Sequence, residues 1–357
     1  MKEKKSSLFG SILIGIIFII VGMILLWWNE GNNVKNIKTV SEISENVIEV
    51  NSSIINPEND GRLILTNGDL VVEDESVYDD VFAVGLKTTN LKRIVEVYQW
   101  EEEKTTDSNN NTTYKYNKEW NEGLINSNSF NNPEYKNPIN VQYESADFTA
   151  LNVKVGEYNL SNEQIENLPT DIELDLFDVV AIEGYKVVGN YITNANDYSN
   201  PQIGDIRISW QYNDWNEATV LAVQNGNTFT NYTSTVGKTI NEVTEGILSS
   251  DEMINKMQDN NDMLKWGLRG TGALLIILGY AALISPLTRL ASFIPFLGGF
   301  VGGTISFIAF LTGVANSLMI IAIAWIRFRP VLGISLLLIC LLLIFIVVRL
   351  IAKNKKK

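Results

Sequence analysis

The feature that most constrains the fold is a run of 21 uncharged residues near the N-terminus, Leu8–Trp28. At about 1.5 Å per residue, a helix of this length spans the roughly 30 Å hydrocarbon core of a bilayer. Three lysines precede the run, as in a signal peptide. The run is too long for one, however, and the bulky Trp27 and Trp28 precede Asn29 and Glu30 where a small-residue cleavage site is needed. We therefore predict that residues 1–28 form a cytoplasmic N-terminus and a first transmembrane helix acting as a signal anchor.

The C-terminal part, residues 266–357, contains further apolar segments that predict three more transmembrane helices, at about 268–287, 304–326 and 331–349. Residues 291–326 are 36 uncharged residues, too many for one straight helix, and glycines divide the stretch. One interpretation places an interfacial or re-entrant segment at 289–303 before a single span, and the other places two short spans there as a hairpin. Four spans in total put both lysine-rich termini on the cytoplasmic side, as the positive-inside rule prefers, whereas five would not. We therefore predict four spans and a basic cytoplasmic tail.

The charge distribution separates a soluble domain from the membrane segments. Residues 29–265 contain 40 of the 41 acidic residues and have a formal charge of −24, whereas residues 266–357 contain no acidic residue. With both termini cytoplasmic, residues 29–265 form an extracytoplasmic domain large enough to bury a core without disulfides. Trp27, Trp28, Trp266 and Trp325 then all lie at the outer water–lipid boundary, where indole rings prefer to be.

Within the soluble domain the pattern is mostly that of β-strands. Asn-Gly pairs at 67–68 and 225–226 stand between apolar runs and predict tight hairpins. Residues 206–212 alternate strictly, and residues 91–103 and 112–120 resemble a second strand pair. Ser161 and Gln164 have capping-box spacing and predict a short helix. Helical periodicity after the first span and before the second predicts juxtamembrane helices that either pack together or pack on the domain. The predicted fold class is α+β: a polytopic membrane protein with a large β-rich extracytoplasmic domain between transmembrane helices 1 and 2.

The composition excludes several chemistries. The chain has no histidine and a single cysteine, so it has no histidine-dependent catalytic triad, no His-based zinc site and no intramolecular disulfide. Its pI of about 4.6 argues against nucleic acid as a partner. Acidic clusters at 73–75, 79–80 and 101–103 lack the spacing of a calcium loop. We therefore predict no catalytic, cofactor-binding or metal-binding residues, and no enzymatic activity.

Two groups of residues near the predicted spans are candidates for interaction. Gly298 and Gly302, and likewise Gly299 and Gly303, are four residues apart, a spacing that permits close helix packing or that loosens a re-entrant turn. Arg327 and Arg329 lie outside between spans three and four, where they could contact lipid headgroups. The arginines at 269, 289 and 349 lie near span ends, so no central charge indicates an ion pathway.

A series of short motifs follows in order from the first predicted span to the last: Asn29–Gly31, Val97–Glu103, Tyr114–Trp120, Ile125–Ser127, Lys136–Pro138, Gly204–Trp210, Lys265–Gly270 and Arg329–Pro330. In this order the series resembles the transmembrane protein 43 (LUMA) family. The resemblance implies one N-terminal span, a large non-cytosolic domain and three C-terminal spans, with no established catalytic residue. Animal members of that family are associated with the inner nuclear membrane and with lamins and emerin.

These observations favour a non-enzymatic membrane-organising scaffold that self-associates or binds other membrane proteins, with membrane lipids as further partners. A lipid-handling or envelope-stress protein is the alternative, and an envelope hydrolase is less favoured. The Asn-, Ile- and Lys-rich composition suggests an AT-rich genome. The expected location is the cell membrane in a prokaryote, or the endoplasmic reticulum and inner nuclear membrane in a eukaryote.

Overall fold

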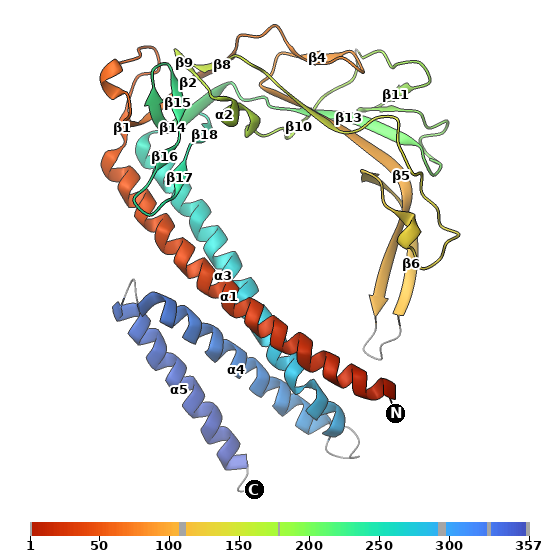
Figure 1. Ribbon diagram of the computed structural model, residues 1–357, viewed down its shortest axis with the longest axis vertical. Coiled ribbons are helices and arrows are strands. Elements are labelled where there is room, and N and C mark those ends of the chain that lie inside the picture. The colour runs from red at the N-terminus through yellow and green to blue at the C-terminus, as the bar shows by residue number, and fades with distance from the viewer. Residues whose placement is uncertain (1, 107–111, 178, 292–297, 327–329, 355–357) are drawn as a thin grey trace. The chain divides into compact units, whose positions relative to one another are not determined.

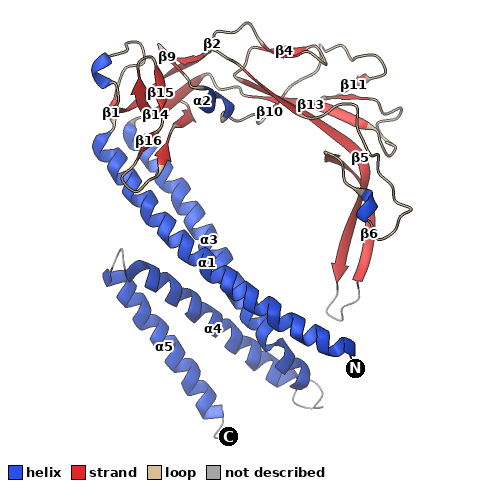
Figure 2. Ribbon diagram, viewed as in Figure 1, coloured by secondary structure: helices blue, strands red, loops and turns tan. Residues whose placement is uncertain are grey.

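The computed structural model describes residues 2–106, 112–177, 179–291, 298–326 and 330–354 (Figure 1). The chain divides into two compact units. The membrane unit comprises Met1–Asn46, Ser234–Lys238 and Asp251–Lys357, and the β-rich unit comprises Val47–Thr233 and Thr239–Ser250. Figure 2 shows that helices dominate the first unit and strands the second. The mixture of helix and sheet and the large β-rich domain are thus confirmed.

The membrane unit consists of four long helices. They are α1 (Lys2–Asn46), α3 (Ser250–Ala291), α4 (Gly298–Ile326) and α5 (Pro330–Asn354). Among the described residues, three stretches are long and apolar enough to cross a membrane: Gly10–Asn46, Ser250–Ser285 and Ser306–Ile326. The first two predicted spans continue without a break into the predicted juxtamembrane helices. In the 289–303 segment, α3 extends to Ala291 and α4 begins at Gly298, while residues 292–297 lie outside the described residues.

The juxtamembrane parts of α1 and α3 pack against each other, which decides between the two expectations for these helices. The Nδ2 of Asn36 donates to Oδ1 of Asn261 at 2.5 Å, and the Nδ2 of Asn29 donates to the carbonyl of Lys265 at 3.1 Å. Seven buried positions of α1 recur every three or four residues, the spacing of a coiled-coil seam. These seven are Gly22, Leu26, Asn29, Asn33, Asn36, Val40 and Ile43.

Glycines bring the two helices into close contact within the predicted spans. A Cβ atom on Gly22 would lie 2.8 Å from the carbonyl oxygen of Gly272, and one on Gly15 would lie 2.7 Å from that of Gly279. Such backbone proximity is the usual reason for small residues in a helix interface. In the described part of the chain, α1 and α3 therefore use glycine for close packing, and Gly313 of α4 does the same against Ile277 of α3.

The β-rich unit contains two seven-stranded sheets. The first has the order β15–β14–β2–β8–β9, with β1 beside β2 and β18 beside β14. Its strands are β1 (Ile48–Glu49), β2 (Leu63–Val72), β8 (Val153–Val155), β9 (Tyr158–Asn159), β14 (Glu217–Asn225), β15 (Thr228–Thr230) and β18 (Glu242–Glu245).

The second sheet has the order β11–β12–β13–β5–β6, with β10 beside β13 and β7 beside β5. Its strands are β5 (Asn90–Thr106), β6 (Thr112–Glu122), β7 (Ala146–Thr149), β10 (Ile172–Glu173), β11 (Lys186–Val188), β12 (Tyr191–Thr193) and β13 (Ile206–Tyr212). The remaining elements are the pairs β3 (Val77–Asp79) with β4 (Val84–Leu86) and β16 (Tyr232–Thr233) with β17 (Thr239–Ile240), the helix α2 (Asn162–Glu166), and 3-10 turns at Pro57–Asn59 and Ser127–Ser129.

Most local predictions in this unit are confirmed. β13 coincides with the predicted strand 206–212, and β5 pairs with β6 along the predicted hairpin. β14 and β15 form a hairpin around Asn225 and Gly226, with Gly226 at φ +62° as a tight turn requires. The capping box at Ser161 and Gln164 is formed in both directions.

The predicted hairpin at Asn67 and Gly68 is wrong. Both residues lie inside the continuous strand β2, where Asn67 pairs with Thr219 of β14. β2 is a central strand: β14 and β1 pair with its first part, and β8 pairs with its last three residues. The side chain of Asn67 also donates to the carbonyl of Leu248 at 2.9 Å. Pairing with β14 along the whole segment therefore outweighs the local turn preference of Asn-Gly.

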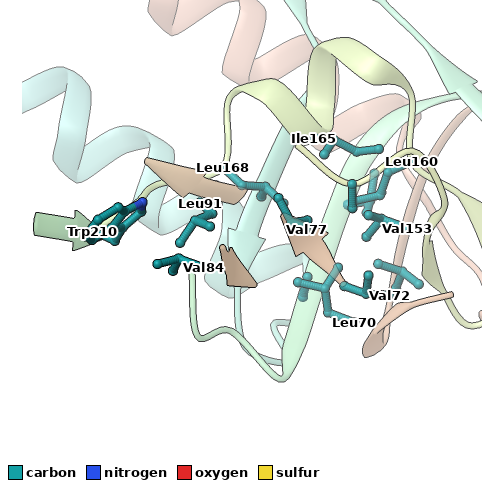
Figure 3. Close-up of a cluster of buried hydrophobic side chains, with 14 of the residues drawn as sticks. Leu70, Val72, Val77, Val84, Leu91, Val153, Leu160, Ile165, Leu168 and Trp210 are labelled. Carbon is teal, nitrogen blue, oxygen red and sulfur yellow. The ribbon is translucent and has the colours of Figure 1, made fainter. Parts of the chain in front are cut away.

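One hydrophobic core joins the two sheets (Figure 3). It contains Leu70 and Val72 of β2, Val153 of β8, Leu91 of β5 and Trp210 of β13, all buried. Within this unit Asp79 is fully buried and accepts from the Arg93 guanidinium at 2.8 Å and from the Trp210 indole at 3.0 Å. This buried ion pair is satisfied by its neighbours, as a buried charge must be.

Candidate functional site

A buried charge cluster lies in the membrane unit where α1, α3 and α4 meet. The Glu30 side chain of α1 is fully buried, and Arg269 of α3 is 9% exposed. The guanidinium binds the carboxylate through two hydrogen bonds, from Nε to Oε1 at 2.6 Å and from Nη2 to Oε2 at 2.9 Å. The indole N–H of Trp325 on α4 donates to the same carboxylate. We call Glu30, Arg269, Trp266 and Trp325 the Glu30 cluster.

Two indole rings complete the Glu30 cluster. The guanidinium carbon of Arg269 lies 4.7 Å from the ring centroid of Trp266 and 5.1 Å from that of Trp325, distances typical of cation–π contact. The arginine thus has a bidentate carboxylate in its plane and aromatic rings near its faces, an environment that lysine could not use equally well. Since the Glu30 carboxylate binds both the Arg269 guanidinium and the Trp325 indole N–H, the cluster is a structural link among three helices.

The Glu30 cluster was not predicted from the sequence. Arg269 was expected near a span end from which its side chain could reach the interface, whereas in the structure the side chain is buried against Glu30. A signal was present: Glu30 belongs to the motif Asn29–Gly31 and Arg269 to the motif Lys265–Gly270, and each flanks a predicted span. Opposite charges at two span ends on the same predicted side are natural partners in a poorly hydrated environment.

Four of the remaining motifs converge on the β5–β6 part of the β-rich unit. The buried Gln99 donates to the carbonyl of Gly123 at 2.7 Å and accepts from the amide of Ile125 at 2.9 Å. The side chain of Asn137 both accepts from the amide of Trp100, at 2.7 Å, and donates to its carbonyl, at 2.8 Å. These bonds attach the loop 123–137 to β5. The residues of these motifs therefore hold the loop 123–137 on strand β5.

The aromatic residues of these motifs pack against one another and against the loop. Tyr98 and Trp120 lie with ring centroids 5.2 Å apart. Tyr135 of the loop stacks on Tyr116 at 3.9 Å and meets Trp100 edge-on at 4.7 Å. The rings contribute to the adhesion between the loop and the sheet.

A hollow of about 750 Å³ lies elsewhere in the β-rich unit, and its lining residues are Ala83, Val84, Gly85, Leu174, Asp175, Phe177, Val179 and Val180. Phe177 and Val180 at its rim are 89% and 86% exposed. Ala83 has φ +54°, a left-handed conformation that costs energy in a residue other than glycine. The combination of exposed large apolar side chains with a strained backbone is typical of a binding surface.

The other predicted site residues are placed as follows. Gly298, Gly299, Gly302 and Gly303 lie in the first turns of α4, and their surroundings lie outside the described part of the chain. Arg327 and Arg329 also lie outside it. The acidic clusters are dispersed among structural contacts: Glu73 pairs with Lys154, Asp79 with Arg93, and Glu102 accepts from Tyr116. Among the described residues, no group of three or more acidic or cysteine side chains could hold a metal ion.

These features define an integral membrane protein in which a large β-rich unit is inserted between the first two long helices of a helical membrane unit. The chain belongs to the Transmembrane protein 43 family, whose profile matches residues 97–330. It is 28% identical to mouse (Mus musculus) Transmembrane protein 43, over 92% of this chain and 87% of that protein. It is also 28% identical to the Drosophila melanogaster Transmembrane protein 43 homolog, over 95% and 94%. No solved structure matches the chain significantly.

Proposed function

We propose that the chain is a non-enzymatic, membrane-organising scaffold that acts by binding further copies of itself or other membrane proteins. It crosses the membrane four times, with α5 as the last span, both termini in the cytoplasm and residues 29–265 outside. Two features support this topology. Both ends of the chain are rich in lysine, and the 92 residues from Trp266 onward contain no acidic residue.

The observation that carries the scaffold role is the exposure of Phe177 and Val180 beside the hollow. Exposing two large apolar side chains to water almost completely is unfavourable, at about 25 cal/mol for each Å² that a partner could cover. An exposed aromatic side chain is a common anchor for a protein partner. Glu30 binds Arg269, and Asp79 binds Arg93. We assign both ion pairs a structural role and not a catalytic one.

Photo-crosslinking in native membranes tests this role. A photoreactive phenylalanine analogue replaces Phe177 in the full chain, and the masses of the adducts are determined. We expect protein adducts, at multiples of the chain mass for self-association or at other defined masses for a partner. The matched control carries the analogue at Ile139, which is 90% exposed in the same unit.

A second variant links the adducts to the apolar surface. Val180→Asp should lower the yield of adducts from position 177 at least several-fold, because a carboxylate at the rim opposes burial. If position 177 forms no more protein adducts than position 139, the surface is not a binding surface and the scaffold proposal loses its support.

A further inference from the structure

A second hollow, with different chemistry, lies on the membrane unit. It is a groove of about 970 Å³ bounded by α1, by the C-terminal part of α4 and by the turn Ser234–Lys238. Its volume is in the range of ligand-binding cavities, about 300–1,000 Å³. Its floor is apolar, formed by Met23 and Ile24 of α1 with Ile320 and Ile323 of α4.

The groove occupies a face of α1 that the other helices leave accessible. Ile24, Trp27, Gly31, Val34 and Lys38 follow at intervals of three or four residues and so share one side of the helix. Ile24 is 63% exposed and Trp27 is 56% exposed, whereas the neighbouring seam toward α3 is buried. The apolar floor therefore faces the space that membrane lipid fills.

Basic side chains surround the outer end of the groove. Lys35 and Lys38 line it, and Lys238 lies in the turn beside Val236, which also lines it. Burial lowers the pKa of Lys238, and the positive charge of Lys35 lowers it further, so the two ammonium groups are close enough to repel each other.

No neighbouring carboxylate neutralises this basic end. Within the described part of the chain, none of the three lysines is in an ion pair, and the groove lining contains no acidic residue. Glu42, one turn beyond Lys38, accepts from the amide and hydroxyl of Thr235 at 3.0 Å and 2.6 Å. Residues 29–265 have a formal charge of −24, yet three lysines gather at this end of the groove. This local positive charge favours the binding of an external anion.

We propose that this groove binds one anionic phospholipid, with an acyl chain along the floor and the phosphate at Lys35 and Lys38. Lys35 lies seven residues beyond Trp28, about 10 Å along the helix. Helical side chains tilt toward the N-terminus, so the ammonium groups reach back toward the tryptophans. When Trp27 and Trp28 lie at the boundary of the hydrocarbon core, the headgroup layer extends about 5–8 Å beyond that boundary. The ammonium groups of Lys35 and Lys38 therefore reach this layer. A soluble phosphate compound would leave the apolar floor uncovered, which is why the occupant is a lipid.

Lipid binding is measured on the full chain reconstituted into vesicles of phosphatidylcholine and phosphatidylglycerol at a ratio of about 3:1, followed by mild extraction and native mass spectrometry. We expect one retained phosphatidylglycerol per chain. The double variant Lys35→Gln/Lys38→Gln should retain it at least about tenfold less, since each lysine near an anionic headgroup strengthens binding about fivefold. The control Lys115→Gln/Lys136→Gln makes the same charge change at two exposed lysines of the β-rich unit.

A steric variant distinguishes the groove from general attraction of anionic lipid. Gly31→Trp places an indole ring in the groove between its floor and the lysines, and the added Cβ atom would meet no neighbouring atom within 4 Å. We expect it to displace phosphatidylglycerol with all lysines intact, whereas Gly267→Trp, on α3 and equally free of contacts, should not. Retention in Gly31→Trp, equal retention of phosphatidylcholine, or equal loss in the lysine control would each overturn the proposal.

Discussion

The Glu30 cluster makes a quantitative prediction about the stability of the membrane unit. Replacing Glu30 by Gln removes the negative charge that compensates the Arg269 guanidinium, which is 9% exposed and cannot regain water without separating the helices. Breaking a buried ion pair on one side typically costs about 3–5 kcal/mol. With a melting-temperature change of about 2–4 °C per kcal/mol for a unit of this size, we expect Glu30→Gln to lower the melting temperature by roughly 6–20 °C.

The measurement is thermal unfolding of the full chain in detergent, followed by the helical circular dichroism signal. Glu96→Gln is the matched control, because Glu96 binds Arg207 in the same bidentate way, at 2.6 and 2.8 Å, but in the β-rich unit. The helical signal should therefore melt at an unchanged temperature in the control.

The double variant Glu30→Gln/Arg269→Gln tests whether the uncompensated charge of Arg269 causes the loss of stability. Two amides can donate to and accept from each other, so this variant should recover most of the loss, as neutral replacements of buried ion pairs generally do. A shift below about 2 °C in Glu30→Gln, or a double variant as unstable as the single one, would refute the reasoning.

Two further predictions concern the helix seam and the β-rich unit. Gly22→Leu should lower the melting temperature of the helical signal by an amount equivalent to about 1–3 kcal/mol, because a Cβ there would lie 2.7 Å from Ile276 and 2.8 Å from the Gly272 carbonyl oxygen. Gly10→Leu, in open space, should not, and equal shifts in both would argue against the close contact. Burial raises the pKa of Tyr185 to about 12, so from about pH 10 the unfolded chain loses a proton that the native state keeps, and stability falls as pH rises toward 12. Urea unfolding of Tyr185→Phe should be less sensitive to pH over this window, and parallel pH profiles would contradict the assignment.

Features with a local cause were predictable from the sequence. The first span, β13, the β14–β15 hairpin and the Ser161 capping box each depend on residues within about one element, because hydrophobic length, alternation and turn chemistry act at short range. The membrane class follows from hydrocarbon thickness and charge distribution, which require no knowledge of the tertiary structure.

The interior of the membrane unit and the strand order required the tertiary structure. Glu30 and Arg269 are 239 residues apart, and although both lie near span ends on the same predicted side, their pairing depends on which faces of α1 and α3 meet. Asn67 and Gly68 have the residue types of a turn, yet β14 on one side makes them part of a central strand. Local preferences of this kind differ by about 1 kcal/mol, less than the pairing and burial that a whole strand gains.

The range over which the residues interact separates the features that the sequence predicts from those that require the tertiary structure. The sequence by itself determined that the chain is a membrane protein with a large β-rich domain, and where many strands lie, since these depend on length, charge and short-range periodicity. Only the tertiary structure shows which helix faces are in contact. It also shows that Arg269 is buried and that Lys35 and Lys38 line one end of an apolar groove. Those features depend on contacts between segments that are distant in the sequence. The free energy of these contacts is gained only when the segments pack together.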